Sequence, residues 1–171
     1  MGRLGIIAGE GRLPRRLADV CQRDGRDFFI LGIKGHADPS LAPVTVRLGE
    51  TDAAIAILKQ QGVDRLVMAG AVRRPSLSEM RPDWRTVQVF ARLGLRALGD
   101  DALLRAVSSE LEKEGFKVIG AHEIDPTLIT PEGILGKVTP DEAQQQDIIA
   151  GIKAAKGLGQ LDIGQAVVVQ Q

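Results

Sequence analysis

Two short segments of the sequence combine glycine and arginine in an arrangement that suits the binding of phosphate groups. Residues 9–14 read GEGRLP, so an apolar run ends in glycines just before a helical pattern begins. The backbone N–H groups and the positive end of such a helix attract anions, and glycines let a phosphate approach the backbone. Residues 70–75 read GAVRRP, again after an apolar run. Arginine offers paired planar donors, and two adjacent arginines can hold a diphosphate.

Both segments also have structural explanations, because glycines are common in turns and loop arginines can simply be solvated. The GEGRLP segment is similar to the dinucleotide-binding fingerprint, but Pro14 stands where that fingerprint has its third glycine. Gly32, Lys34 and Gly35 occupy the end of the second predicted strand, where an acid would hold a ribose. The sequence therefore disfavours a Rossmann-type oxidoreductase that uses a nicotinamide or flavin cofactor.

Three further residues could contact a ligand. Asp100 and Asp101 open a predicted helix, where they could reach a substrate hydroxyl or a magnesium ion, since hard cations take oxygen ligands. Their favourable interaction with the helix dipole explains the pair equally well. His122 follows a predicted strand and could form a hydrogen bond to a ligand, although a lone histidine is more often structural. The sequence contains no His-Cys cluster for zinc, no P-loop and no serine nucleophile elbow.

The composition narrows the class of protein. The chain has 171 residues and 22 basic against 22 acidic side chains, so its charge balance gives no indication of a nucleic-acid partner. A single cysteine, Cys21, excludes an internal disulfide and is typical of a reducing compartment, which predicts a cytoplasmic protein. No apolar run approaches the roughly 18 residues of a membrane-spanning helix, and the N-terminal apolar run is too short for a signal peptide.

Short apolar runs alternate with longer stretches of helical period, which predicts an α/β fold: a Rossmann-like, mainly parallel sheet with flanking helices. This first domain should cover residues 1–130. The predicted strands are residues 4–8, 27–31, 44–48, 65–69 and 117–120. The predicted helices are residues 13–23, 51–62, 84–98 and 100–115. Arg85, Arg92 and Arg96 share one face of the third helix, which indicates a solvated stripe or, less favoured, a membrane-surface face.

A Pro- and Gly-punctuated segment, residues 125–140, indicates a boundary, so residues 131–171 should be a linker and the beginning of a second α/β domain. We expect a helix from about Thr139 to Gly157 and a strand over residues 164–170. One helix and one strand cannot form a core, and an unpaired strand edge promotes association. The sequence therefore predicts a fragment of a longer protein, or a chain that pairs with itself or with the remaining half.

Five segments together resemble one family, the LpxI-type UDP-2,3-diacylglucosamine pyrophosphatases. The segments, in order, are IIAGEGRLP, VMAGAVRRPSLSEMRPD, GDDALLRAVSSELEKEGFKVIGAHE, LITPEGILGKVTPDE and LDIGQAVVVQ. The resemblance covers essentially the whole chain and is far more specific than any single motif. It implies a cytoplasmic enzyme that contacts the surface of the inner membrane transiently. This enzyme would hydrolyse the diphosphate of UDP-2,3-diacylglucosamine with Mg²⁺. The products would be UMP and 2,3-diacylglucosamine 1-phosphate (lipid X), an intermediate of lipid A biosynthesis.

The resemblance also implies a set of substrate-binding residues. The nucleotide or diphosphate pocket would be lined by Glu10, Gly11 and Arg12, with Ala71, Val72 and Arg73 as its second wall. Asp100, Asp101 and His122 would come from the neighbouring strand edge, and Gly164 and Gln165 would start the sugar and acyl side.

The sequence departs from the family by ending at Gln171, before the acidic segment that carries the family's catalytic carboxylate. We therefore expect the catalytic residue beyond residue 171 and assign no catalytic residue or metal ligand within this chain. A non-catalytic nucleotide-sugar-binding module is the principal alternative, and a Rossmann-type oxidoreductase is the third.

Overall fold

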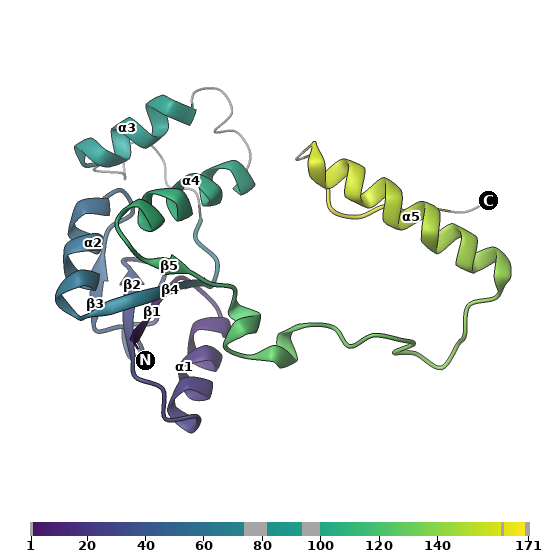
Figure 1. The fold of residues 1–171 in the computed structure, drawn as a ribbon, viewed down its shortest axis with the longest axis horizontal. Helices are drawn as coiled ribbons and strands as arrows, with labels where there is room; N and C mark the ends of the chain where they lie inside the picture. Colours follow the sequence, from purple (N-terminus) through teal and green to yellow (C-terminus); the bar gives the residue numbers. More distant parts are fainter. Residues whose placement is uncertain (1, 74–81, 94–99, 162, 170–171) are drawn as a thin grey trace. The chain divides into compact units, whose positions relative to one another are not determined.

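The computed structural model describes residues 2–73, 82–93, 100–161 and 163–169, drawn in colour in Figure 1. The chain divides into two compact units, Met1–Ile129 and Thr130–Gln171, and each is described by itself. No helix in the described ranges is both long enough and apolar enough to cross a membrane.

The first unit is built on a five-stranded sheet in which every pair of neighbouring strands is parallel. The strands lie in the order β3-β2-β1-β4-β5. Their bounds are β1 Arg3–Ala8, β2 Phe28–Ile33, β3 Val44–Val46, β4 Val63–Ala69 and β5 Lys117–Val118. The central strand β1 aligns Ile6 with Ile30 of β2 on one side and with Val67 of β4 on the other. The predicted α/β fold with a parallel sheet is thus confirmed, with strand ends that differ from the prediction by at most two residues.

Helices cover both faces of this sheet (Figure 1). They are α1 Leu13–Arg23, α2 Thr51–Gln60, α3 Trp84–Leu93 and α4 Asp100–Lys113, followed by two short 3-10 helices, η2 Ala121–Glu123 and η3 Pro126–Leu128. Helix α1 has the predicted bounds, with Pro14 in its first turn, where the missing N–H is not needed. The helix predicted over residues 84–98 is observed to Leu93, and residues 94–98 lie outside the described ranges.

The core consists of two apolar clusters, one on each face of the sheet. Leu4 and Ile6 of β1 pack with Leu17 and Cys21 of α1 on one face. The other cluster joins the side chains of β2, α2, β4 and α4, and its most buried members are Leu31, Leu58 and Leu66. Successive strand residues point to opposite faces, so a strand buried on both sides reads as a continuous apolar run.

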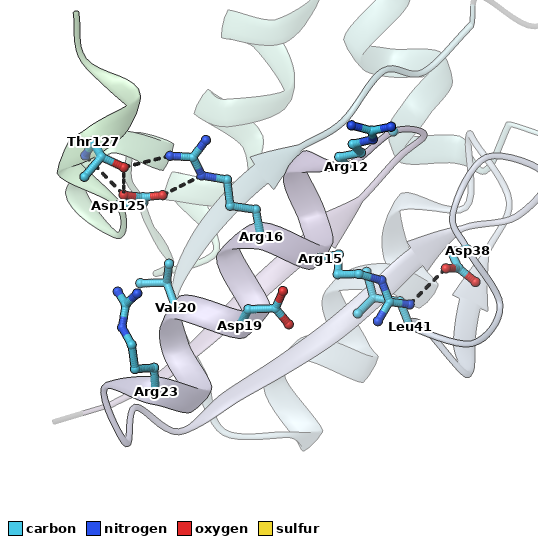
Figure 2. Close-up of a pocket in the computed structure, with 11 residues that line it drawn as sticks. Arg12, Arg15, Arg16, Asp19, Val20, Arg23, Asp38, Leu41, Asp125 and Thr127 are labelled. Atoms are coloured by element: carbon cyan, nitrogen blue, oxygen red, sulfur yellow. Dashed lines mark hydrogen bonds and ion pairs between the residues drawn. The ribbon is translucent and has the colours of Figure 1, made fainter.

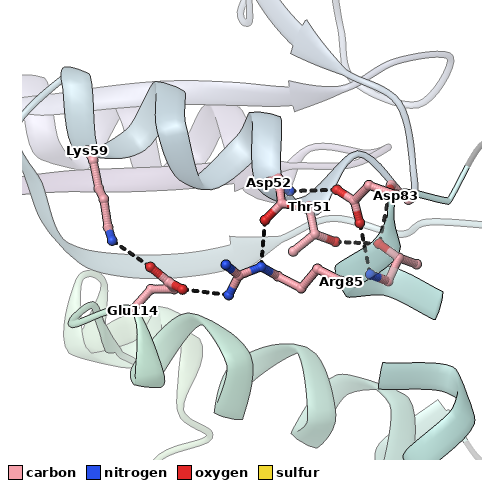
Figure 3. Close-up of polar contacts among 8 residues, drawn as sticks. Thr51, Asp52, Lys59, Asp83, Arg85 and Glu114 are labelled. Carbon is pink, nitrogen blue, oxygen red and sulfur yellow. Dashed lines mark hydrogen bonds and ion pairs between the residues drawn. The ribbon is translucent and has the colours of Figure 1, made fainter. Parts of the chain in front are cut away.

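A polar network holds α3 against α2 and α4 (Figure 3). Arg85 is ion-paired with Asp52 of α2 and with Glu114 at the end of α4, and Glu114 also pairs with Lys59. The prediction of a solvated or membrane-facing arginine stripe is therefore wrong for Arg85, because both of its charged partners lie on neighbouring helices. The side chain of Arg92, and all of Arg96, fall outside the described part.

One carboxylate in this network caps two helices at once. The Asp83 oxygens accept hydrogen bonds from the backbone N–H of Asp52 at 2.7 Å and of Thr86 at 2.8 Å. The first donor lies in the opening turn of α2 and the second in the opening turn of α3. Burial raises the pKa of Asp83, but the hydrogen bonds from Asp52 and Thr86 outweigh it and hold that pKa below its usual range.

The second unit contains helix α5, Glu142–Gln160, which begins at a capping box formed by Asp141 and Gln144. The helix begins and ends three residues later than predicted. The predicted strand is wrong: residues 163–169 form no strand, and Val167 and Val169 lie beside Gly151 of α5 instead. A strand needs a hydrogen-bonded neighbour, and the described residues of this unit provide none. Association of the chain with a second copy or with the remaining half stays a prediction.

Candidate functional site

The order of the strands identifies the edge of the sheet where a ligand would bind. From β1 the chain proceeds to β2 and β3 on one side, and it returns to place β4 and β5 on the other. Open parallel sheets bind ligands outside the carboxyl ends of the strands, at the point where the strand order reverses. That point lies between β1 and β4, and both predicted phosphate-binding segments follow these two strands directly.

The loops after β1 and β4 are joined by their backbones. Glu10 N–H donates to the Ala71 carbonyl at 2.7 Å, and Ala71 N–H donates to the Glu10 carbonyl at 3.0 Å. A Cβ on Gly70, whose φ is +94°, would lie 2.5 Å from the Glu10 oxygen, and one on Gly9 would lie 2.4 Å from the Ala71 oxygen. Only glycine permits this approach. Gly9 and Gly70 thus allow the backbones of the two loops to approach each other closely, a role that was not predicted from the sequence.

Gly11 differs from these two glycines, because its surroundings are open. Its φ is +96°, and no atom lies within 4 Å of the position of a Cβ. Arg12 follows as the N-cap of α1, but its side chain forms no capping hydrogen bond, and the first turn contains no acid. The N–H groups of this turn and the positive end of the helix therefore lack an anionic partner within the helix, as an anion site requires.

An open cavity of about 960 Å³ extends from this turn along the outer surface of α1 (Figure 2). Its charged lining is mostly arginine. Arg15 pairs with Asp38 at 3.0 Å, and Arg16 pairs with Asp125 at 2.7 Å. Arg12 is exposed and has no ion pair within the described part of the chain. The complete lining is Gly11, Arg12, Arg15, Arg16, Asp19, Val20, Arg23, Asp38, Leu41, Asp125 and Thr127.

Asp125 ties the end of the first unit to α1. It is buried, and hydrogen bonds from Thr127 and then from Arg16 hold its pKa below the usual range. Arg16 also donates to the Thr127 hydroxyl at 2.7 Å. The carboxylate is fully partnered, so its role in the cavity wall is structural.

The Glu10 side chain lies at the centre of a polar cluster at the strand ends. One carboxylate oxygen is 3.0 Å from Nδ1 of His36, and the other is 3.3 Å from an Nη of Arg73. His36 follows β2, Glu10 follows β1 and Arg73 follows β4, so three adjacent strands contribute one residue each. The side chains are 15%, 31% and 82% exposed, in that order.

His36 is a residue that the sequence analysis missed. The available signal was its place in the turn after the second strand, since carboxyl ends of parallel strands meet at one edge. The structure joins Ala71 to Glu10 by two backbone hydrogen bonds and places Val72 beside Gly9, while the role of both residues as a wall of the ligand site stays a prediction. His122 lies in η2 beyond β5, and no hydrogen bond or ion pair connects it with the cluster within the described residues.

The remaining predicted residues are not tested by this geometry. Asp100 begins α4, but its side chain and that of Asp101 lie outside the described part, as does Arg74 altogether. Gly164 and Gln165 belong to the second unit. No three His, Cys, Asp or Glu side chains among the described residues are grouped so that they could hold a metal ion.

The chain matches two family models in succession. Residues 3–128 match the LpxI N-terminal domain, and residues 131–171 match the LpxI C-terminal domain. A curated relative, the UDP-2,3-diacylglucosamine pyrophosphatase LpxI of Caulobacter vibrioides, is 43% identical over 173 residues. That match covers 99% of this chain but 62% of the relative, so the chain spans less than two thirds of the relative's length.

Among solved structures, the biotin carboxylase subunit of pyruvate carboxylase has a TM-score of 0.37 and 13% identity, covering 73% of this chain and 24% of that one. That similarity is too low to support an argument. The two family models, which together span nearly the whole sequence, show that the chain belongs to the LpxI family.

Proposed function

We propose that this chain acts in the hydrolysis of UDP-2,3-diacylglucosamine to UMP and 2,3-diacylglucosamine 1-phosphate, a reaction of lipid A biosynthesis. The observation that carries the proposal is the 43% identity, over 99% of the chain, with a relative whose name states this pyrophosphatase activity. The geometry agrees, because an open glycine, an arginine with no ion pair to any described residue and a helix N-terminus converge at the ligand-binding edge of the sheet.

In this proposal the diphosphate binds at Gly11 and Arg12, against the first turn of α1. Arg73 approaches from the loop after β4, with Ala71 and Val72 as the second wall. The arginines and the backbone N–H groups would stabilise the negative charge that grows on the phosphoryl oxygens. Asp100 and Asp101 at the start of α4 and His122 of η2 remain proposed contacts. Gly164 and Gln165 remain proposed contacts on the sugar and acyl side.

Because of its negative charge, Glu10 has a different role from the arginines beside it. A carboxylate about 5 Å from a phosphate charge would repel it by about 3 kcal/mol at an effective dielectric constant of about 20. Glu10 is therefore poorly suited to touch the diphosphate directly. Its contacts with His36 and Arg73 suit it instead to orient these two N–H donors around the site.

Magnesium stays part of the proposal as the cofactor, but the described residues do not fit a complete magnesium site. They contain no group of three potential ligands, and Glu10 is already shared between His36 and Arg73. We therefore assign no metal ligand and no step to the ion. The cytoplasm as location, and transient contact with the inner-membrane surface, are likewise proposed, because the substrate carries acyl chains that an enzyme meets at a membrane.

The test is release of UMP from UDP-2,3-diacylglucosamine, with magnesium present, by material whose intact mass has been measured. In the active protein, Arg73→Ala should reduce turnover about a hundredfold, as expected for the loss of one donor worth about 3 kcal/mol. Arg26→Ala is the matched control, because Arg26 precedes β2 at the opposite edge of the sheet and pairs only with Asp24 among the described residues. A loss below about threefold for Arg73→Ala would contradict its assignment.

A non-catalytic nucleotide-sugar-binding module is the second candidate. It is favoured because the described residues offer an open, anion-binding turn at Gly11 and Arg12 but no group of three possible metal ligands. Binding of a UDP-sugar without any UMP release would support this candidate. Release at enzymatic rates would exclude it.

A further inference from the structure

A chain of polar contacts crosses the ligand-binding edge of the sheet from the loop after β2 to the loop after β4. His36 Nδ1 lies 3.0 Å from one Glu10 oxygen, and an Arg73 Nη lies 3.3 Å from the other. An ionised carboxylate only accepts hydrogen bonds, so Nδ1 carries a hydrogen and donates it to Glu10. One carboxylate thus connects an imidazole with a guanidinium.

His36 and Glu10, the two less exposed residues in this series of contacts, have fixed backbones. The N–H groups of His36 and Ala37 both donate to the Ile33 carbonyl, at 3.0 and 2.9 Å, so a tight turn fixes the backbone that carries the imidazole. Gly35, with φ of +84°, permits that turn. The backbone of Glu10 is fixed by its two hydrogen bonds with Ala71. What remains free in Glu10 is the rotation of its side chain, and His36 restricts it.

Arg73 is the exposed end of this series of contacts. Its side chain is 82% exposed, and Glu10 is its one charged partner within the described residues. An exposed arginine has many rotamers, and fixing such a side chain at a binding interface costs about 0.5–1.5 kcal/mol, a factor of about two to ten in affinity. A guanidinium that is already held at the site when the ligand arrives avoids part of that loss.

We propose that His36 is a positioning residue: through Glu10 it holds the Arg73 guanidinium at the site of a nucleoside diphosphate. The proposal rests on the proposed function for the class of ligand and on the contact geometry for the role of His36. The histidine also leaves both Glu10 oxygens occupied by N–H donors, so the carboxylate faces these donors rather than the ligand.

Calorimetric titration with UDP tests this role on the whole protein. His36→Leu removes the donor, whereas His36→Asn retains an N–H close to the position of Nδ1. We expect His36→Leu to weaken UDP binding about two- to tenfold and His36→Asn to restore it. In an Arg73→Ala background, His36→Leu should have no further effect. An equal loss in that background would show that His36 acts through general folding and would overturn the proposal.

A second readout separates this proposal from the proposed function. The Arg73 Nε–H group should give an NMR signal separate from those of freely rotating arginines in the unmodified protein and in His36→Asn. In His36→Leu this signal should move to the averaged position of a freely rotating arginine. An unchanged Arg73 signal in His36→Leu would overturn the positioning role whatever UDP does. If the unmodified protein binds no UDP, the proposed function fails, and the Arg73 signal still decides whether His36 orders the guanidinium.

Discussion

Replacing Gly70 with alanine tests whether the loops after β1 and β4 are held together by direct backbone approach. The new Cβ would lie 2.5 Å from the Glu10 carbonyl oxygen and 2.8 Å from the Gly9 carbonyl carbon. Both atoms belong to the main chain and cannot rotate away as a side chain would. The substitution therefore has to separate the loops or distort them.

The expected loss has two parts. A residue other than glycine at φ of +94° costs about 1–2 kcal/mol. Separating the loops breaks one or both Glu10–Ala71 hydrogen bonds, each worth about 0.5–1.5 kcal/mol. Gly70→Ala should therefore lower the free energy of unfolding by about 2–5 kcal/mol. Gly11→Ala is the matched control, because its φ is +96° but no atom lies within 4 Å of its Cβ position.

Urea denaturation followed by circular dichroism would measure both variants. We expect Gly11→Ala to lose only the conformational part, about 1–2 kcal/mol. The difference between the variants then isolates the contact between the loops. Equal losses for Gly70→Ala and Gly11→Ala would refute the reasoning, since the contact would then contribute nothing measurable.

Three further predictions concern groups that stabilise the fold. Asp83→Ala should lower the free energy of unfolding by about 2 kcal/mol in urea denaturation, because the carboxylate caps both Asp52 and Thr86, at about 1 kcal/mol for each cap; a loss below about 0.5 kcal/mol would contradict the double cap. The lowered pKa of Asp125 means that its contribution to stability is complete above about pH 5 and is lost as the pH falls below about 4. Asp125→Asn should flatten that acid limb of a stability profile, and an unchanged limb would count against the assignment. Burial raises the pKa of the Cys21 thiol, so a thiol reagent should modify it far faster in urea than in the native protein; similar rates would show that the helix opens readily.

Local signals were sufficient for much of the first unit. The bounds of α1 could be predicted from Pro14 and the helical spacing that follows it, because both are properties of the helix itself. The strand ends could not, because they depend on pairing. β2 continues to Ile33 since Gly32 and Ile33 pair with β3, and β5 is short since it pairs with β4 at two positions only.

The candidate site shows the same limit. Glu10 and Arg73 could be predicted as site residues from the segments that contain them, but not as an ion pair, and His36 could not be connected with either. Those contacts depend on the strand order, which places β2 and β4 on opposite sides of β1. The strand expected over residues 164–170 failed for a related reason, since an apolar run forms a strand only where a partner strand is present.

The paired backbones of Glu10 and Ala71 make the two loops one rigid rim rather than two independent flaps. Their amide hydrogens should exchange with solvent together, because neither hydrogen bond can open without disturbing the other. A ligand that touches only the loop after β1 should therefore slow hydrogen exchange in the loop after β4 as well. Through this rigid connection, ligand binding at one loop would stabilise the other loop while the strands stay in place.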